Sequence, residues 1–266
     1  MKRLLFSTVC LLLVSSLALA QAKSKVTSKK VQRYGGIACG SDPILPTDGN
    51  IATIYDFVAA SSSAYYLVNL KDGHSYSAEV YDSTDPTVVA GSAQLSLIAA
   101  ADCTTVLTTQ DVANYDPDLS GSFAARISWI QTGNVSAVLV LKNSDANDPY
   151  NYNIRIADTT LHNPRWSTFA GFITQYALVN NTSHDIAGTL TLTSSTGTSY
   201  SSQVTIPAGG EKLEQTSDLG IPPTLFGFAT FAYVGPAGAI TADADFINPS
   251  GTVIVPSTFA PRDYQH

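Results

Sequence analysis

The sequence predicts an all-β protein built from two consecutive antiparallel β-sandwiches. Short segments alternate between apolar and polar residues with a period of two, which is typical of half-buried strands. Turn-forming residues separate these segments every eight to twelve residues, and no long stretch has a helical period. From Tyr34 onward the chain has 233 residues, enough for two domains of about 100–150 residues each.

The first 20 residues have the pattern of a secretory signal peptide. Two basic residues precede a short apolar run at residues 4–17, and a small-x-small cleavage site follows at residues 18–20. The run is too short to span a bilayer, and Cys10 lies inside it rather than at its end, so we expect no lipidation. We expect a secreted or periplasmic protein that begins near Gln21, with no stable membrane insertion after signal cleavage.

The mature chain is acidic, although its first residues are basic. The signal segment contains two of the 14 basic residues and none of the 21 acidic ones, so the rest of the chain has a formal charge of −9. From Tyr34 onward the charge is −14, which argues against nucleic-acid binding. Residues 21–47 form a basic linker and N-terminal segment, which we interpret as solvated; contact with an anionic surface is the alternative. Its basic residues are Lys23, Lys25, Lys29, Lys30 and Arg33.

A hairpin at residues 64–81 organises the first half. Asp72-Gly73 between two alternating runs indicates a tight turn, because glycine adopts positive φ at no steric cost. In the second run the residues from His74 to Val80 at even positions face one way and those from Ser75 to Tyr81 at odd positions the other, which predicts a half-buried strand. Strands are predicted at residues 51–58, 64–70, 74–82, 93–100, 122–132, 135–143 and 150–157, and exposed loops at 82–91 and 101–121.

Residues 159–168 interrupt this succession of alternating strands. His162, Asn163 and Pro164 make a poor strand-forming sequence, and Trp166 is expected to pack at the junction of the two halves. We therefore place the first sandwich at residues 48–160 and the second at 168–266. A weak helical pattern at residues 109–115 is interpreted as a loop or a single turn.

The second half shows the same pattern of short alternating strands separated by turns. Strands are predicted at residues 172–181, 188–194, 200–207, 211–216, 226–234, 240–248 and 252–259. Seven short strands with regular turns are typical of an immunoglobulin-like sandwich. In the sixth strand Ile240, Ala242, Ala244 and Phe246 should face the core, while Thr241, Asp243 and Asp245 face outward.

Each half resembles a known class of module. Residues 65–76, YYLVNLKDGHSY, and 150–156, YNYNIRI, resemble strands of bacterial pre-peptidase C-terminal domains. That likeness implies a jelly-roll-like sandwich used as an accessory or binding module of exported proteins. Its calcium-binding members use an acidic N-terminal linker, whereas this linker is lysine-rich, so no calcium site is implied. Residues 176–181, 188–192 and 206–210 resemble Ig- or fibronectin-like modules of secreted bacterial proteins, which are usually structural or adhesive.

A search for catalytic motifs identifies none. The chain has no Gly-x-Ser-x-Gly, His-Glu-x-x-His, phosphate-binding glycine loop or Cys-x-x-Cys. The four histidines, His74, His162, His184 and His266, are scattered, so we expect no catalytic, cofactor-binding or metal-binding residue.

Three weaker candidates for chemistry have plain alternatives. Asp243 and Asp245 share a strand face and could hold calcium or act as an acid–base pair, but an exposed polar face is favoured. Two loops could bind calcium but are more typical of turns; they contain Asp145, Asn147 and Asp148, and Asp116 and Asp118. The neighbours of Tyr65, Tyr81 and Tyr233 suggest that these three rings face outward, where they could stack on a sugar.

The cysteines predict one covalent link. Cys39 and Cys103 are the only cysteines after signal removal, and an oxidising compartment favours a disulfide between them. The alternative is a pair of separate buried thiols. A bridge would attach the glycine-flanked segment around Cys39 to the first sandwich.

The favoured function is that of an exported, non-enzymatic binding or adhesion protein whose partner is an extracellular protein or a glycan. A carbohydrate-binding accessory protein and a hydrolase of unrecognised type are the alternatives. A flat row of exposed aromatic residues would favour the first alternative. A cleft with converging His, Asp and Ser would favour the second.

Overall fold

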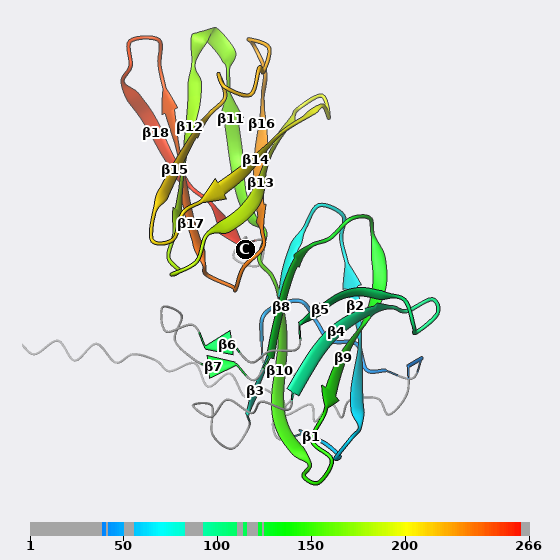
Figure 1. Cartoon of the computed structure of the whole chain (residues 1–266). Helices are drawn as coiled ribbons and strands as arrows, with labels where there is room; N and C mark the ends of the chain where they lie inside the picture. The colour runs from blue at the N-terminus through cyan, green and yellow to red at the C-terminus, as the bar shows by residue number, and fades with distance from the viewer. Residues whose placement is uncertain are drawn as a thin grey trace, which may run out of the picture. The chain divides into compact units, whose positions relative to one another are not determined.

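The computed structural model describes residues 39–40, 42–50, 56–82, 93–110, 114–115, 122–123 and 125–261. The expected signal peptide, the basic tail, Asp116, Asp118 and His266 lie outside these residues. The described chain is all-β, with four antiparallel main sheets that form two consecutive sandwiches, as predicted (Figure 1). Within it, no helix has the length and hydrophobicity needed to cross a bilayer.

The first sandwich has two four-stranded sheets. One has the order β1 (Asp56–Val58), β10 (Tyr150–Asp158), β3 (Ser75–Asp82), β8 (Ala125–Ile130). The other has the order β2 (Ser63–Leu70), β9 (Val135–Asn143), β4 (Ala93–Ala99), β5 (Val106–Gln110). A small ladder joins β6 (Asn114–Tyr115) to β7 (Ser122–Phe123).

The core of the first sandwich follows the predicted alternation. Tyr76, Ala78 and Val80 of β3 face it, as do the alternate residues of β2 and β10. The hydroxyls of Tyr66 and Tyr152 hydrogen-bond inside this core at 2.7 Å, so two polar groups are buried together. Gly73 has φ +72° in the β2–β3 turn, which is the conformation that the Asp-Gly pair predicts.

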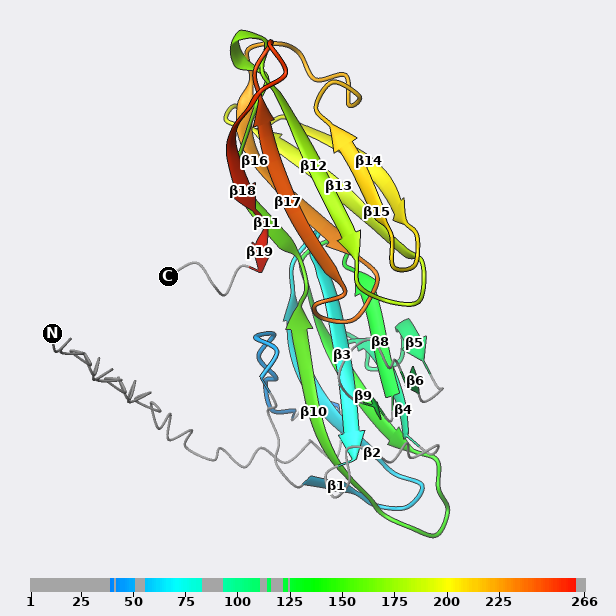
Figure 2. The same cartoon turned by 90° about the vertical axis from the view of Figure 1, so that its left-hand side faces the viewer.

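The second sandwich has a five-stranded and a four-stranded sheet (Figure 2). The first has the order β14 (Ser199–Ile206), β13 (Ile186–Ser194), β16 (Phe226–Tyr233), β11 (Leu161–Ser167), β19 (Ala260–Pro261). The second has the order β15 (Glu211–Gln215), β12 (Ile173–Asn180), β17 (Ile240–Ile247), β18 (Val253–Thr258). A 3-10 turn, η1 (Phe169–Gly171), joins β11 to β12.

Three strands lie where the sequence predicted breaks. Residues 161–167 form β11, which pairs with β16 despite Pro164, because the register shifts between Asn163 and Trp166. A bulge leaves proline outside the ladder, where its missing N–H costs no hydrogen bond. Trp166 is fully buried in the core of the second sandwich rather than at a junction. The expected exposed loop at 101–121 likewise contains β5 and β6, and residues 109–110 and 114–115 belong to these strands instead of a turn.

Strand β3 is buried on both faces, which corrects the half-buried strand that its alternation predicted. Ser75, Ser77 and Glu79 on its polar face are 0–1% exposed. The Ser75 hydroxyl accepts a hydrogen bond from Thr159, and its N–H donates to the Thr160 hydroxyl, both at 2.9 Å. Alternation therefore gave the direction of each side chain correctly but not the burial of the polar face.

Candidate functional site

The second sandwich contains an apolar hollow at its edge, with a volume of about 510 Å³. Both sheets and η1 contribute to its wall, and five of the ten lining residues are aromatic. The lining residues are Pro164, Arg165, Trp166, Ser167, Phe169, Phe172, Phe226, Gly227, Phe246 and Val255. We call this feature the aromatic hollow.

The aromatic hollow has a buried floor and an exposed rim. Trp166 and Phe246 are 0% and 6% exposed and form part of the sandwich core. Phe169 and Phe226 are 59% and 56% exposed, which is unusual for phenylalanine. The volume lies within the range of about 300–1,000 Å³ that small-molecule sites have.

The bulge in β11 places the one charged side chain of the lining. Asn163 is buried; its side-chain oxygen accepts a hydrogen bond from the Arg165 N–H at 3.1 Å. Its amide nitrogen donates to the Ser257 hydroxyl of β18 at 2.9 Å, which links the two sheets beside the hollow. The Arg165 guanidinium lies 4.8 Å from the centre of the Phe246 ring, a cation–π geometry.

The η1 turn displays two further rings. Ala170 has φ +54°, a left-handed conformation that is costly for alanine, in the turn between Phe169 and Phe172. The buried Thr168 hydroxyl donates to the Pro222 carbonyl at 2.9 Å and accepts from the Leu225 N–H at 3.2 Å. These bonds tie the turn to the segment that leads into Phe226, so the rim residues are held by one framework.

The lining of the aromatic hollow is apolar apart from Arg165 and the Ser167 hydroxyl. Among the described residues that line the aromatic hollow, there is no acidic side chain, histidine or cysteine. Acid–base catalysis needs a titratable group within hydrogen-bond reach of the reacting atom, and this lining offers none. Its rings offer apolar area, and its arginine offers a cation.

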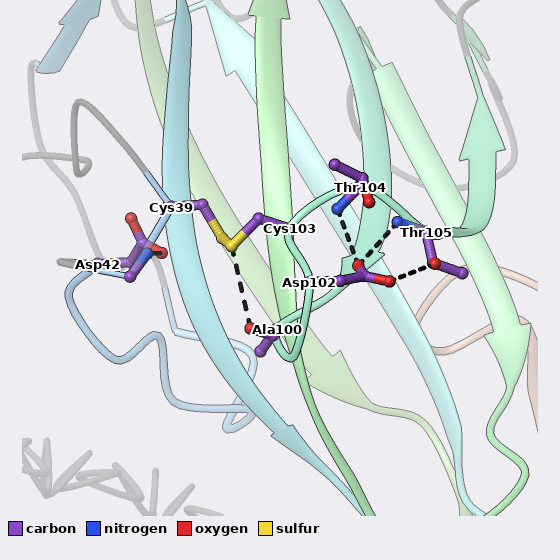
Figure 3. The surroundings of a disulfide bond; sticks show 8 residues. Cys39, Asp42, Ala100, Asp102, Cys103, Thr104 and Thr105 are labelled. Carbon is purple, nitrogen blue, oxygen red and sulfur yellow. Dashed lines mark hydrogen bonds between the residues drawn. A yellow bond between two sulfur atoms is a disulfide. The ribbon is translucent and has the colours of Figure 1, made fainter.

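The predicted disulfide between Cys39 and Cys103 is present, with Cα atoms 6.0 Å apart (Figure 3). It lies over the outer face of the sheet that contains β2, where both cysteines pack beside Val138 and Val140. Backbone bonds continue the attachment: the Leu45 N–H donates to Leu67 O at 2.8 Å. The bridge thus joins the N-terminal segment to the first sandwich, as expected.

The loop that carries Cys103 is ordered by Asp102. Its carboxylate accepts hydrogen bonds from the Thr104 and Thr105 N–H groups, both at 2.9 Å, and from the Thr105 hydroxyl (Figure 3). The bonds from Thr105 and Thr104 lower the Asp102 pKa to about 2. This carboxylate therefore has a local structural role.

The candidate carboxylates lie on the outward face of β17 and in a turn of the first sandwich. Asp243 is exposed and Asp245 is half-buried, both on the outward face of β17 as predicted. In the other loop, Asp145 accepts hydrogen bonds from the N–H groups of Asn147 and Asp148, which is a turn. These bonds lower the Asp145 pKa. The described residues contain no cluster of three or more His, Cys, Asp or Glu side chains that could hold a metal ion.

The three tyrosines proposed as a sugar platform lie in separate settings. Tyr65 packs half-buried beside the disulfide, and Tyr81 donates a hydrogen bond to Glu79 at 2.6 Å. The prediction for Tyr233 was wrong, because this side chain is 1% exposed and its hydroxyl donates to Pro236 O. Tyrosine carries an apolar ring and a polar tip, so its type did not indicate which face it occupies.

Two histidines that are distant in sequence lie close together. His74 Nδ1 is 2.7 Å from Asp158 Oδ2, and the His74 and His162 ring centres are 5.8 Å apart. Burial raises the Asp158 pKa, but hydrogen bonds from His74 and Thr160 outweigh it and the net pKa is lowered. Among the described residues, no serine, threonine or cysteine is hydrogen-bonded to the His74 ring.

The sequence did not indicate that Glu79 of β3 is buried in an ionic cluster. Glu79 is 1% exposed; it accepts hydrogen bonds from Arg155 Nε and from Tyr81, both at 2.6 Å. Burial, followed by the charge of Glu79, raises the Tyr81 pKa. Glutamate on a polar strand face usually meets solvent, so the cluster becomes visible only once the partners of Glu79 are placed.

The sequence analysis also did not predict the aromatic hollow. The alternation of β16 places Phe226 and Phe228 on its outward face, and this was a usable signal.

Comparison with known proteins gives no further identification. No protein-family model matches the chain, and no match was found among curated proteins.

Proposed function

We propose that this chain is an exported, non-enzymatic binding protein and that the aromatic hollow of its second sandwich is the binding surface. The observation that carries the proposal is the exposure of phenylalanine rings around a built cavity: Phe169 and Phe226 are each more than half exposed. Contiguous exposed apolar surface with polar surroundings is characteristic of interaction sites.

Export is part of the proposal and has two supports. The sequence begins with a signal-peptide pattern, and the Cys39–Cys103 disulfide is a bond that persists in oxidising compartments. The likeness of each half to modules of exported bacterial proteins agrees with a binding role. Fold likeness alone does not define a ligand, so the proposal rests on the hollow.

The two alternative functions have weaker support. The exposed rings of Phe226 and Phe228 lie on one face of β16, but the hollow beside them is lined by apolar side chains with few hydrogen-bonding groups for a sugar. A hydrolase would use His74 and Asp158, and the His74 ring has no hydrogen bond to a hydroxyl or thiol among the described residues.

The proposal is tested with N-phenyl-1-naphthylamine, an uncharged probe that fluoresces in apolar sites, and the mature chain from Gln21. We expect saturable binding that Phe226→Ala and Phe169→Ala each weaken by about tenfold or more, since one buried phenylalanine contributes about 1.5–3 kcal/mol. Phe57→Ala is the matched control, because Phe57 is 60% exposed but belongs to β1 of the first sandwich. Equal losses in all three variants, or no saturable binding, would contradict the proposal.

A further inference from the structure

We propose that the aromatic hollow binds an anionic amphiphile: an apolar chain or ring system that carries a single carboxylate or phosphate, paired with Arg165. This inference rests on the proposed function and names the class of ligand. It is carried by the charge and geometry of one side chain in an otherwise apolar wall.

Arg165 is the only charged residue of the lining, and its position is built by the fold. The bulge of β11 puts it outside the strand ladder, and the buried Asn163 holds its backbone N–H. Its guanidinium is stacked on the ring of Phe246 at 4.8 Å. A stacked guanidinium keeps the N–H groups at its edge available, in a planar fork that matches carboxylate or phosphate oxygens.

The described residues give this cation no carboxylate partner. Their ion pairs are His74–Asp158, Arg155–Glu79 and Lys212–Glu214, and none includes Arg165. The chain from Tyr34 onward has a formal charge of −14, so an arginine with no carboxylate partner among the described residues is a local exception. Charge complementarity therefore favours a ligand with a negative group at this end.

The rest of the wall determines what the anion is attached to. The rings of Phe169, Phe172 and Phe226, with Val255, surround the space beside Arg165. An inorganic anion would leave these apolar surfaces in water, whereas an acyl chain or an aromatic ring would cover them. A neutral apolar ligand would cover them too, but would leave the arginine without a counter-charge.

The test compares three ligands with the same chain, dodecanoate, dodecyl phosphate and 1-dodecanol, each used below the concentration at which it aggregates. Displacement of N-phenyl-1-naphthylamine from the mature protein gives the affinities, and calorimetry checks that of dodecanoate directly. We expect at least one anion to bind about tenfold more tightly than 1-dodecanol, the effect of one hydrogen-bonded charge pair. The carboxylate and phosphate arms distinguish the two head groups.

Variants assign the effect to Arg165. Arg165→Gln should reduce the affinity for the anion to that for 1-dodecanol, and Arg165→Lys should restore part of the difference. Lys212→Gln is the matched control: it removes one positive charge from β15 of the same sandwich, outside the hollow lining. Circular dichroism of each variant establishes that it is folded.

The outcomes separate the two proposals. If the probe binds and depends on Phe226, but all three ligands bind equally or none displaces it, the inference is overturned while the proposed function stands. The inference is also overturned if Arg165→Gln and Lys212→Gln weaken anion binding equally, because the effect is then one of net charge. If neither probe nor ligand binds, both proposals fail.

Discussion

The two sandwiches bury polar groups in different ways. The first encloses charge: Glu79 is buried and pairs with the half-buried Arg155, whose Nη2 lies 2.5 Å from its carboxylate. Among the described residues, the buried polar side chains of the second sandwich are neutral. Asn180 is typical: its amide donates to His184 O at 2.7 Å, and its oxygen accepts from Thr182.

This difference determines which perturbation each sandwich should resist. A buried ion pair becomes costly when one partner is removed, because the other charge remains in a low-dielectric setting. Neutral hydrogen bonds to backbone carbonyls contribute about 1 kcal/mol each and do not depend on pH.

Removal of the disulfide should have the largest effect and should act on the first sandwich. Cys39→Ser with Cys103→Ser opens a loop of 64 residues in sequence separation, for which chain entropy predicts a loss of up to about 4 kcal/mol. Each sandwich has one tryptophan, Trp129 or Trp166. Urea titrations of the Trp129→Phe and Trp166→Phe variants, with and without reductant, follow each sandwich separately. An equal shift of both transitions on reduction would contradict this prediction and the division into two folding units.

Glu79→Gln should cost about 3 kcal/mol, the low end for a broken buried pair, because Arg155 is still about one-third exposed. Lys212→Gln is its control: it breaks the 3.6 Å pair between the exposed Lys212 and the half-buried Glu214 of the second sandwich and should cost at most about 0.5 kcal/mol. Urea denaturation measures both. Similar losses in the two variants would show that the burial of Glu79 contributes nothing.

Removing the hydroxyl of one buried tyrosine in each sandwich should change stability by a smaller amount. Tyr66→Phe should lose about 1 kcal/mol, since it leaves the buried Tyr152 hydroxyl without this 2.7 Å bond. Tyr176 is fully buried in the second sandwich, and no described residue hydrogen-bonds to its hydroxyl, so Tyr176→Phe should be neutral or raise stability by up to about 1 kcal/mol. Thermal unfolding of the two variants is the measurement, and a larger loss for Tyr176→Phe would reverse the comparison.

Asp243→Asn with Asp245→Asn should have the smallest effect, within about 0.5 kcal/mol, because the two side chains face outward on β17. The melting temperature should be the same with and without added calcium. A large loss of stability that calcium prevents in the unmodified protein would reveal a metal site on this strand.

The sequence by itself determined the strands and their phase. The predicted strands at 135–143 and 150–157 coincide with β9 and β10 to within one residue. In β17 the alternate residues Ile240, Ala242, Ala244 and Phe246 are buried as expected. The two cysteines that remain outside the expected signal peptide were enough to predict the bridge. These features follow from local chemistry: the pleat sends alternate side chains to opposite faces whatever else is present.

Tertiary structure alone decided what each face meets. The odd positions of β3 and of β17 are both polar, yet Glu79 is buried beside Arg155 and Asp243 is exposed. Strand β11 exists because β16 pairs with it on both sides of a bulge, which no local propensity around Pro164 predicts. The same bulge positions Arg165, so the candidate site depends on pairing between residues some 60 positions apart. Period and composition describe one strand at a time, whereas burial is a property of the strands and loops that pack against it.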